Sequence, residues 1–270
     1  MTGLACFVLW LAWGTHVFAL ARKAPAGPAA TGITFVGCAF LTVGLVQRGL
    51  MAGHWPLTNR YEFALCFTWA IVAVYLLLEA GWRERGAGPF VLAVALLMAT
   101  YALTCPAEQR AIAPLIPALR SPWLEVHVLT ALVGYGAFGV AAGLGVMQWA
   151  RRAMWDEGSP AAHNWPASEE VERAMGRAVA LGFPWLTLSI LAGAVWAQNA
   201  WGRYWGWDPK ESWALITWLW YLLVLHVRPL RRWRGRRLAA LVVVGFGIVL
   251  FTFIGVPWLV RTVQLESLHG

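Results

Sequence analysis

The sequence has few charged residues and lacks any polar stretch long enough to form a soluble domain. Only 13% of its 270 residues are charged, whereas 60% are hydrophobic. This composition is typical of a polytopic membrane protein rather than of a soluble one. The charges that do occur are mainly basic, with 21 Lys and Arg against 13 Asp and Glu. The resulting net charge of +8 would suit nucleic-acid binding, but the placement of the basic residues, given below, argues against that function.

Cysteine is also scarce, and its spacing excludes two kinds of site. The four cysteines, Cys6, Cys38, Cys66 and Cys105, lie far apart and mostly inside apolar runs. Because there is no Cys-x-x-Cys pair and no Cys/His cluster, neither a zinc site nor a thiol relay is supported. We expect these cysteines to act as small buried hydrophobic residues. The N-terminus lacks a basic region and a clear small-residue cleavage site, so the first apolar run is predicted to be a spanning helix rather than a signal peptide.

Eight apolar runs are long enough to cross a membrane, which takes roughly 17–25 helical residues. They lie at about 3–21, 31–49, 61–80, 88–105, 123–150, 179–200, 209–228 and 238–258, separated by charged residues, Pro and Gly. We therefore predict an all-α, polytopic integral membrane protein with about eight transmembrane helices and a single membrane domain over residues 1–270.

The basic residues are divided unequally between the two sets of connecting loops. One set holds 14 of the 21: Arg22, Lys23, Arg83, Arg85, Arg151, Arg152, Arg173, Arg177, Arg228, Arg231, Arg232, Arg234, Arg236 and Arg237. The other holds seven: Arg48, Arg60, Arg110, Arg120, Arg203, Lys210 and Arg261. The positive-inside rule places the first set in the cytoplasm, so both termini are predicted to be extracytoplasmic, at an inner (plasma) membrane. The basic residues thus set the topology, and they can also contact anionic lipid.

Two further features bear on the fold. Residues 151–178 form the longest polar stretch and are predicted to be a cytoplasmic loop in which 168–173 form a short surface helix. In the fifth span, Gly139 and Gly143 form a Gly-x-x-x-Gly pair, and we expect them to allow close helix packing.

The segment 201–213 is the least random part of the sequence. It reads Trp-Gly-Arg-Tyr-Trp-Gly-Trp-Asp-Pro-Lys-Glu-Ser-Trp, with two acids that balance two bases. Neutral, aromatic and at a membrane surface, it suits a flat apolar ligand with polar edges, because indoles offer both stacking faces and N–H donors. The alternative is an interfacial belt of Trp, although belts are normally scattered over many helix ends. Asp208 and Glu211 also fit a structural role, since they are placed to cap the next helix, with Pro209 at its first position.

Residues 201–213, continuing through Trp218 and Tyr221 to His226, resemble the tryptophan-rich (WWD) haem-handling motif of the cytochrome c assembly family. The form Trp-Asp-Pro-Lys-Glu, followed by Leu-x-x-x-x-Leu-His-x-Arg, is most similar to the CcsA (ResC) branch, a subunit of system II cytochrome c synthetase. Relatives of the CcmC and CcmF type share the aromatic core but differ after the Asp. The resemblance implies that Trp201, Trp205, Trp207 and Asp208 contact haem b.

An iron porphyrin needs axial ligands, and histidine is a common one. The predicted topology assigns each of the six histidines to one side of the membrane. His127 is predicted to lie about 7–8 Å inside the helix that starts at Pro122, level with the Trp-rich segment. His269 follows the last span on the same side. The resemblance implies that His127, in its Trp-Leu-x-x-His-Val context, and His269 are the external iron ligands, with His54 as a substitute for His269.

His226 is predicted to lie roughly 26 Å along its helix from Pro209, near the cytoplasmic face. The resemblance implies that it binds a second haem within the membrane, and that the other ligand comes from a partner subunit, CcsB (ResB). His16, in the inner half of the first span, is an alternative to the partner's ligand. His163 has no evident role. A lone interfacial His of no function is the alternative reading of His226.

Asn59-Arg60-Tyr61-Glu62 opens the third span, and a similar Asn-x-Tyr-Glu occurs in CcsA-like proteins. Arg60 could bind a haem propionate through charge-assisted hydrogen bonds, or it could be an interfacial anchor. Both interpretations stay open.

The resemblance implies a function in cytochrome c biogenesis. Haem would cross the membrane and be attached, as by a holocytochrome c synthetase (haem lyase), to apocytochrome c that carries Cys-x-x-Cys-His. No catalytic residue of this chain is needed, because the attacking thiols belong to the apocytochrome. The alternatives are a CcmC-type haem exporter or relay without ligation activity, and a polytopic subunit that binds a quinone or lipid.

Overall fold

The computed structural model describes residues 1–22, 26–82, 85–154 and 167–263, and these residues form helices and no strand. All eight predicted spans are helical. The long helices are α1 (Thr2–Ala21), α2 (Pro28–Ala52), α3 (Arg60–Trp82), α4 (Gly88–Thr104), α6 (Pro122–Met154), α7 (Ser168–Trp201), α8 (Pro209–Val227) and α9 (Arg236–Leu250). A π-helical turn, η5 (Phe251–Gly255), joins α9 to α10 (Val256–Val263), and the short α5 (Ala107–Arg110) lies between α4 and α6.

Most of these helices suit a lipid bilayer. Within the described residues, six are long and apolar enough to cross it: α1, α2, α3, α6, α7 and the continuous segment Arg236–Val260. The apolar α4 is shorter, at 17 residues. Helix α8 has 19 residues and begins with the polar sequence Pro209-Lys210-Glu211. The protein is therefore an all-α, polytopic membrane protein, as predicted.

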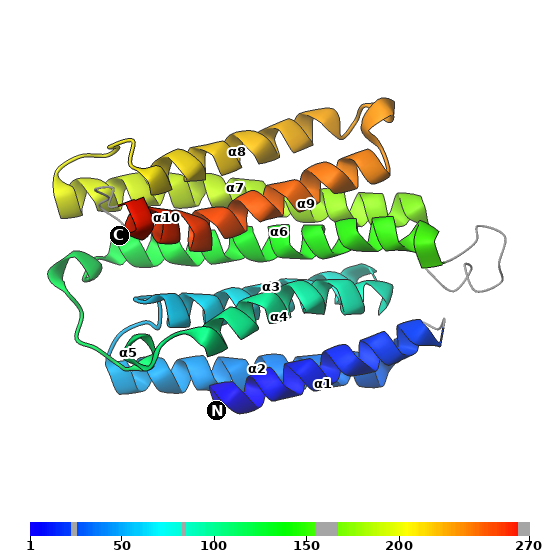
Figure 1. Cartoon of the computed structure of the whole chain (residues 1–270), viewed down its shortest axis with the longest axis horizontal. Helices are drawn as coiled ribbons and strands as arrows, with labels where there is room; N and C mark the ends of the chain where they lie inside the picture. The colour runs from blue at the N-terminus through cyan, green and yellow to red at the C-terminus, as the bar shows by residue number, and fades with distance from the viewer. Residues whose placement is uncertain (23–25, 83–84, 155–166, 264–270) are drawn as a thin grey trace.

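The long helices run along one common direction, so the bundle has two ends (Figure 1). The turn at 53–59, the α4–α6 connection and the loop between α7 and α8 share one end, here called the Trp-loop end. The C-terminal ends of α1, α3, α6 and α8 lie at the opposite end of the bundle, here called the basic end. The predicted alternation of loops is therefore confirmed.

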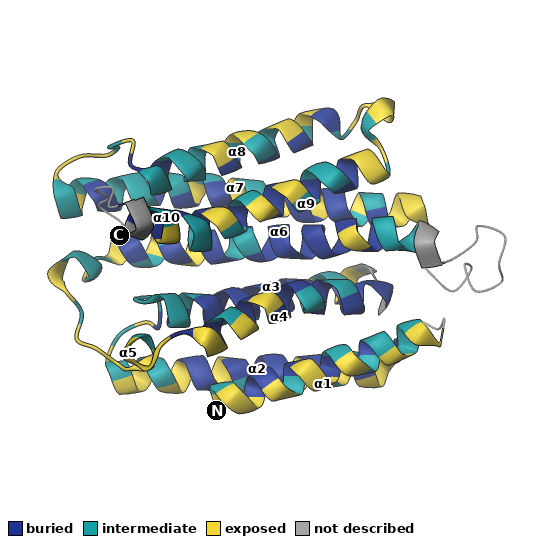
Figure 2. Cartoon of the chain, viewed as in Figure 1, coloured by how far each residue is buried: buried dark blue, intermediate teal, exposed yellow. Residues whose placement is uncertain are grey.

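Helix α6 is the central element of the bundle. It packs against α3, α4, α7 and α9, and most of its length is buried (Figure 2). Its glycines allow this approach: a Cβ at Gly139 would lie 2.8 Å from the Ile71 side chain, and one at Gly143 would lie 2.7 Å from the Val91 Cα. The prediction that they serve helix packing is confirmed.

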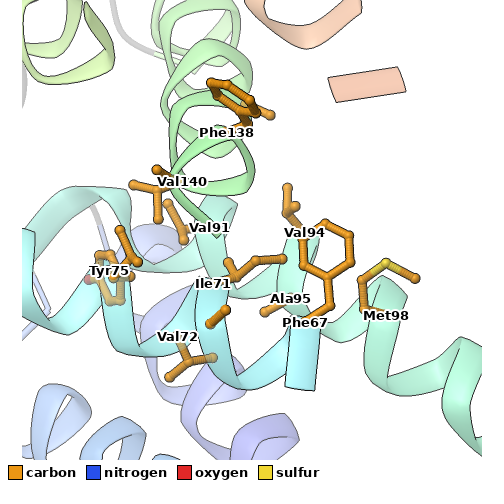
Figure 3. Packing of buried hydrophobic residues seen from close by; sticks show 14 of the residues in the cluster. Phe67, Ile71, Val72, Tyr75, Val91, Val94, Ala95, Met98, Phe138 and Val140 are labelled. Carbon is orange, nitrogen blue, oxygen red and sulfur yellow. The ribbon is translucent and has the colours of Figure 1, made fainter. Parts of the chain in front are cut away.

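The core between α3, α4 and α6 is apolar and closely packed. Figure 3 shows Phe67 and Ile71 of α3 beside Val94 and Met98 of α4, with Phe138 of α6 above them. All four cysteines are free and buried, as expected. Among the described residues there is no group of three or more His, Cys, Asp or Glu that could hold a metal ion.

Helix α7 begins earlier than predicted. Residues 168–178 are not part of a loop with a separate surface helix, because they form the first three turns of the continuous helix Ser168–Trp201. The Glu-rich start of this segment is compatible with a helix N-terminus, since acidic side chains interact favourably with the helix dipole there. The polar composition of residues 168–178 suggested that the spanning helix starts after them, but these residues continue the same helix.

Candidate functional site at the Trp-loop end

The Trp-rich segment is a short loop held between two helix ends. Helix α7 ends at Trp201, and Gly202 follows in the left-handed conformation with φ of 75°, which glycine adopts without strain. Helix α8 begins after Asp208, whose Oδ1 accepts hydrogen bonds from the backbone N–H groups of Lys210 (2.8 Å) and Glu211 (3.0 Å). The predicted N-cap role of Asp208 is confirmed, and the loop proper is residues 202–208.

Glu211 closes the loop in a different way from the predicted capping box. Its Oε2 accepts a 2.6 Å hydrogen bond from the backbone N–H of Gly206, two residues before the N-cap, instead of from the N-cap itself. The loop therefore folds back over the first turn of α8. Gly206 leaves room for the Arg203 guanidinium, which would lie 2.5 Å from a Cβ at this position.

Two of the three aromatic rings in the loop are exposed. Trp207 is 70% exposed and Tyr204 is 61% exposed, and Trp207 is the one non-glycine residue with positive φ in the described chain. Trp205 packs edge-on against Trp207 at 5.7 Å between ring centroids. The indole N–H of Trp205 is buried and has no acceptor among the described residues. An acceptor from outside the described residues would satisfy this N–H group.

His127 lies at this end, held in a cradle formed by α7. Its Nδ1 is 2.7 Å from the backbone carbonyl oxygen of Ser189, and the Ser189 hydroxyl donates to the His127 carbonyl at 3.0 Å. The ring fills the space above Gly193, where a Cβ would lie 2.7 Å from Nδ1. A carbonyl can only accept, so Nδ1 carries the proton and Nε2 carries the lone pair. Iron-ligating histidines are commonly oriented in this way by a carbonyl on the other ring nitrogen.

Aromatic contacts connect His127 to the Trp-rich segment. The His127 ring lies parallel to Trp196, at 6.2 Å and 18°, and Trp196 packs edge-on against Trp201 at 4.7 Å. The Trp196 indole donates to the carbonyl of Ala118 at 2.9 Å, which ties the α4–α6 connection to the same place. The structure therefore connects His127 to the first Trp of the motif through Trp196.

In Asn59-Arg60-Tyr61-Glu62, the residues around Arg60 have structural roles. Asn59 caps α3 through its side chain, and the Tyr61 hydroxyl is 3.1 Å from that of Thr2. Glu62, only 1% exposed, forms a 2.8 Å ion pair with Arg48. Arg60 has no hydrogen bond to a described residue, so its two interpretations, as a propionate ligand and as an interfacial anchor, both stay open.

The two histidines that the sequence placed near the cytoplasm lie at opposite edges of the bundle, on α1 and α8 (Figure 1). His16 is fully buried, with Nε2 3.2 Å from the Thr34 hydroxyl, and its ring packs against Gly88. His226 is exposed on α8, and its Nδ1 donates to the Leu222 carbonyl at 2.9 Å. His16 therefore cannot pair with His226 on one iron.

The remaining candidates are placed as follows. His54 lies in the turn after α2, where its Nδ1 is 2.9 Å from the Trp55 carbonyl oxygen and its Nε2 is buried without a partner among the described residues. His269 and His163 lie outside the described residues. The sequence analysis missed Ser189, Gly193 and Trp196. Their spacing of four and three residues along one helix face was the available signal, but small residues on a helix have many possible partners.

Comparison with known proteins gives consistent matches. The family model described as Cytochrome C assembly protein matches residues 57–264. The chain is 34% identical over 246 residues to the cytochrome c biogenesis protein CcsA of Guillardia theta, covering 84% of this chain and 82% of that protein. It is 37% identical over 257 residues to CcsA of Synechococcus elongatus, covering 78% and 79%. With CcsA of Gloeobacter violaceus it shares 34% identity over 284 residues, covering 86% and 84%.

Proposed function

The chain belongs to the cytochrome c assembly protein family, in its CcsA branch, and from this membership we propose that it binds haem at the Trp-loop end and presents it there to apocytochrome c. A role in cytochrome c biogenesis, with haem and apocytochrome c as partners, follows from the family. The finer assignments are proposals: haem b as the cargo, an extracytoplasmic position for the Trp-loop end, and a CcsB-type partner subunit in an inner (plasma) membrane.

One observation carries the proposal: the orientation of His127. Its protonated Nδ1 is fixed by Ser189, and its ring is joined through Trp196 to Trp201. An imidazole in this tautomer has its lone pair on Nε2, the atom that would bind iron, and the exposed indole of Trp207 in the adjoining loop would offer a stacking face to a porphyrin. The uneven distribution of basic residues supports an extracytoplasmic position for this end.

Each residue then has a defined part. His127 and His269 ligate the iron, and the rings of Trp205 and Trp207 stack on the porphyrin. Trp201 supports His127 through Trp196, and Asp208 keeps the loop in shape by capping α8. Arg60 binds a propionate. The chain positions the haem, while the nucleophiles are the two thiols of Cys-x-x-Cys-His, each of which adds its S–H across one vinyl C=C to form a thioether.

His226 has a separate part in delivery. Its side chain is exposed on the outer surface of α8. Its Nδ1 donates to the backbone carbonyl of Leu222, which places the lone pair on Nε2. We propose that its second iron ligand comes from the partner subunit, since none of the other histidines that the structure describes lies near it. Haem held here, near the basic end, is the supply for the Trp-loop end.

The proposal is tested by the visible spectrum of the purified protein. Wild type should show a Soret band, His127→Ala should lose most of it, and added imidazole should restore part. His163→Ala, a histidine with no assigned role, is the matched control and should resemble wild type. A wild-type protein without a Soret band would reject the haem function.

Attachment is tested separately from binding. The chain is co-expressed with a CcsB-type partner and a c-type reporter in cells that lack other assembly systems. Covalent haem on the reporter is expected. If the protein carries haem but the reporter stays apo, the chain acts as a CcmC-type relay without ligation activity.

A further inference from the structure

The connection between α8 and α9, residues 228–237, is a folded loop at the basic end (Figure 1), here called the Arg loop because six of its ten residues are arginine. The backbone N–H of Gly235 donates to Oε2 of Glu172 on α7 at 2.7 Å. The indole of Trp149 on α6 donates to the carbonyl of Arg236 at 3.1 Å. These bonds tie the loop to α6 and α7, so its arginines are presented from a fixed backbone.

Four arginines of the Arg loop are exposed, and none of them forms an ion pair with an acid in the described part of the chain: Arg231, Arg232, Arg236 and Arg237. Glu172 is the described acid that contacts the loop, and it pairs with Arg234 at 3.8 Å. The Arg237 guanidinium donates to the Arg232 carbonyl at 2.9 Å, which keeps two of the positive charges close together. The loop is therefore a concentrated and largely unbalanced positive surface.

This arrangement of cations has an electrostatic cost. Like charges repel one another, and Arg236 and Arg237 also occupy the first turn of α9, where the helix dipole is positive and acidic residues are favoured. That turn contains no acid. In the same loop, the indole N–H of Trp233 is buried and has no acceptor among the described residues. Anions beside the loop would offset the repulsion.

The positive-inside rule accounts for the sign of these charges but not for their arrangement. The rule depends on how many basic residues lie close to the end of a span, and it does not require those residues to be held in a folded structure. Here the loop has a fixed backbone with a glycine at φ of 66°, and it keeps its arginines together despite their repulsion. A binding role for the surface explains this feature.

The position of the Arg loop indicates which anion it binds. The segment Arg236–Val260, which is long and apolar enough to cross a membrane, begins inside the loop, so the loop lies at the depth of the lipid headgroups. Leu230 is 43% exposed and Trp233 is half-buried, so apolar side chains stand among the arginines. Guanidinium groups match phosphate oxygens in a bidentate geometry. A phospholipid matches both the apolar and the basic side chains, whereas a soluble phosphate matches only the basic ones.

We propose that the Arg loop binds the headgroup of an anionic phospholipid such as phosphatidylglycerol. Arg231, Arg232, Arg236 and Arg237 contact the phosphate, and Leu230 lies toward the acyl chains. The bound lipid offsets the repulsion between the arginines and stabilises the junction of α8 and α9. This inference is independent of the haem function.

The test is a lipid titration of the purified protein in detergent, followed by native mass spectrometry. Phosphatidylglycerol is compared with phosphatidylcholine of the same acyl chains, and wild type should bind phosphatidylglycerol more tightly. The double variant Arg232→Gln, Arg236→Gln should bind phosphatidylglycerol roughly 25-fold more weakly, which is about fivefold for each arginine. Its binding of phosphatidylcholine should not change. The matched control is Arg173→Gln, Arg177→Gln, which removes two exposed arginines of α7 and should behave as wild type.

Four outcomes would overturn the proposal. The first is a wild type that binds the two lipids equally, and the second is an unchanged affinity for phosphatidylglycerol in the Arg-loop variant. The third is an equal loss in the α7 control, since the attraction would then come from the whole basic end. The fourth is displacement of phosphatidylglycerol by inorganic phosphate at the same concentration, which would make the loop a site for free anions. Thermal unfolding in phosphatidylcholine nanodiscs, expected to be the same for all three proteins, shows that the variants are folded.

Discussion

The cradle of His127 depends on Gly193, and this gives the sharpest prediction. A Cβ at position 193 would lie 2.7 Å from Nδ1 and 2.9 Å from Cε1 of His127, well inside the optimal separation of about 3.5–4.0 Å. Gly193→Ala must therefore move the imidazole. Because Nδ1 donates the 2.7 Å hydrogen bond to Ser189, the substitution disrupts the contact that orients the ring.

The expected effect is large on haem affinity and small on stability. Loss of the group that orients a metal-ligating histidine typically weakens metal binding about 10–100-fold, so we expect a decrease of that size in haem affinity. The lost hydrogen bond costs about 0.5–1.5 kcal/mol of folding free energy. The higher helix propensity of Ala over Gly returns about 0.8–1.0 kcal/mol, so the two effects nearly cancel.

The assay measures both quantities on the same sample. Haem affinity is taken from a Soret titration of the haem-free protein, and stability is taken from thermal unfolding followed by circular dichroism. Gly247→Ala is the matched control, because a Cβ at this helical glycine meets nothing within 4 Å. If Gly193→Ala binds haem as tightly as wild type, the Ser189 carbonyl does not orient an iron ligand and the assignment of His127 is wrong.

Three other substitutions follow from the same contacts. Asp208→Ala should lower stability by about 1 kcal/mol through the lost N-cap, measured by thermal unfolding, whereas Asp208→Asn should restore it; a full loss in the Asn variant would point to a role for the charge instead. Arg48→Ala leaves the buried Glu62 carboxylate unpaired and should destabilise the fold by about 3–5 kcal/mol, seen as a lower unfolding temperature; an unchanged temperature would contradict this. His226→Ala, on an exposed face, should leave unfolding unchanged and lower the yield of holocytochrome, and a normal yield would demote His226 to a structural residue.

The positions and ends of the helices were predictable from local sequence. Apolar runs of spanning length fix where α1–α4 and α6–α9 lie, because a backbone in lipid must satisfy its own hydrogen bonds. The N-cap at Asp208 was likewise predictable, since its partners are two and three residues away. The boundary of α7 was not, because a polar helix start and a polar loop have similar compositions.

The roles of individual side chains required the tertiary structure. The sequence put His127 in the first turns of its helix, but only the packing of α6 on α7 shows that Ser189, 62 residues away, fixes its tautomer. The sequence left His16 open as a partner of His226, and the bundle separates them because α1 and α8 lie at opposite edges (Figure 1). Arg60, unlike Asn59 and Glu62, has no hydrogen bond from its side chain to a described residue, and the sequence does not show this difference. Helical periodicity and capping depend on residues within one or two turns of each other, so the sequence determines them directly. Contacts between helices depend on which helix faces meet, and those faces are known only once the whole chain has folded.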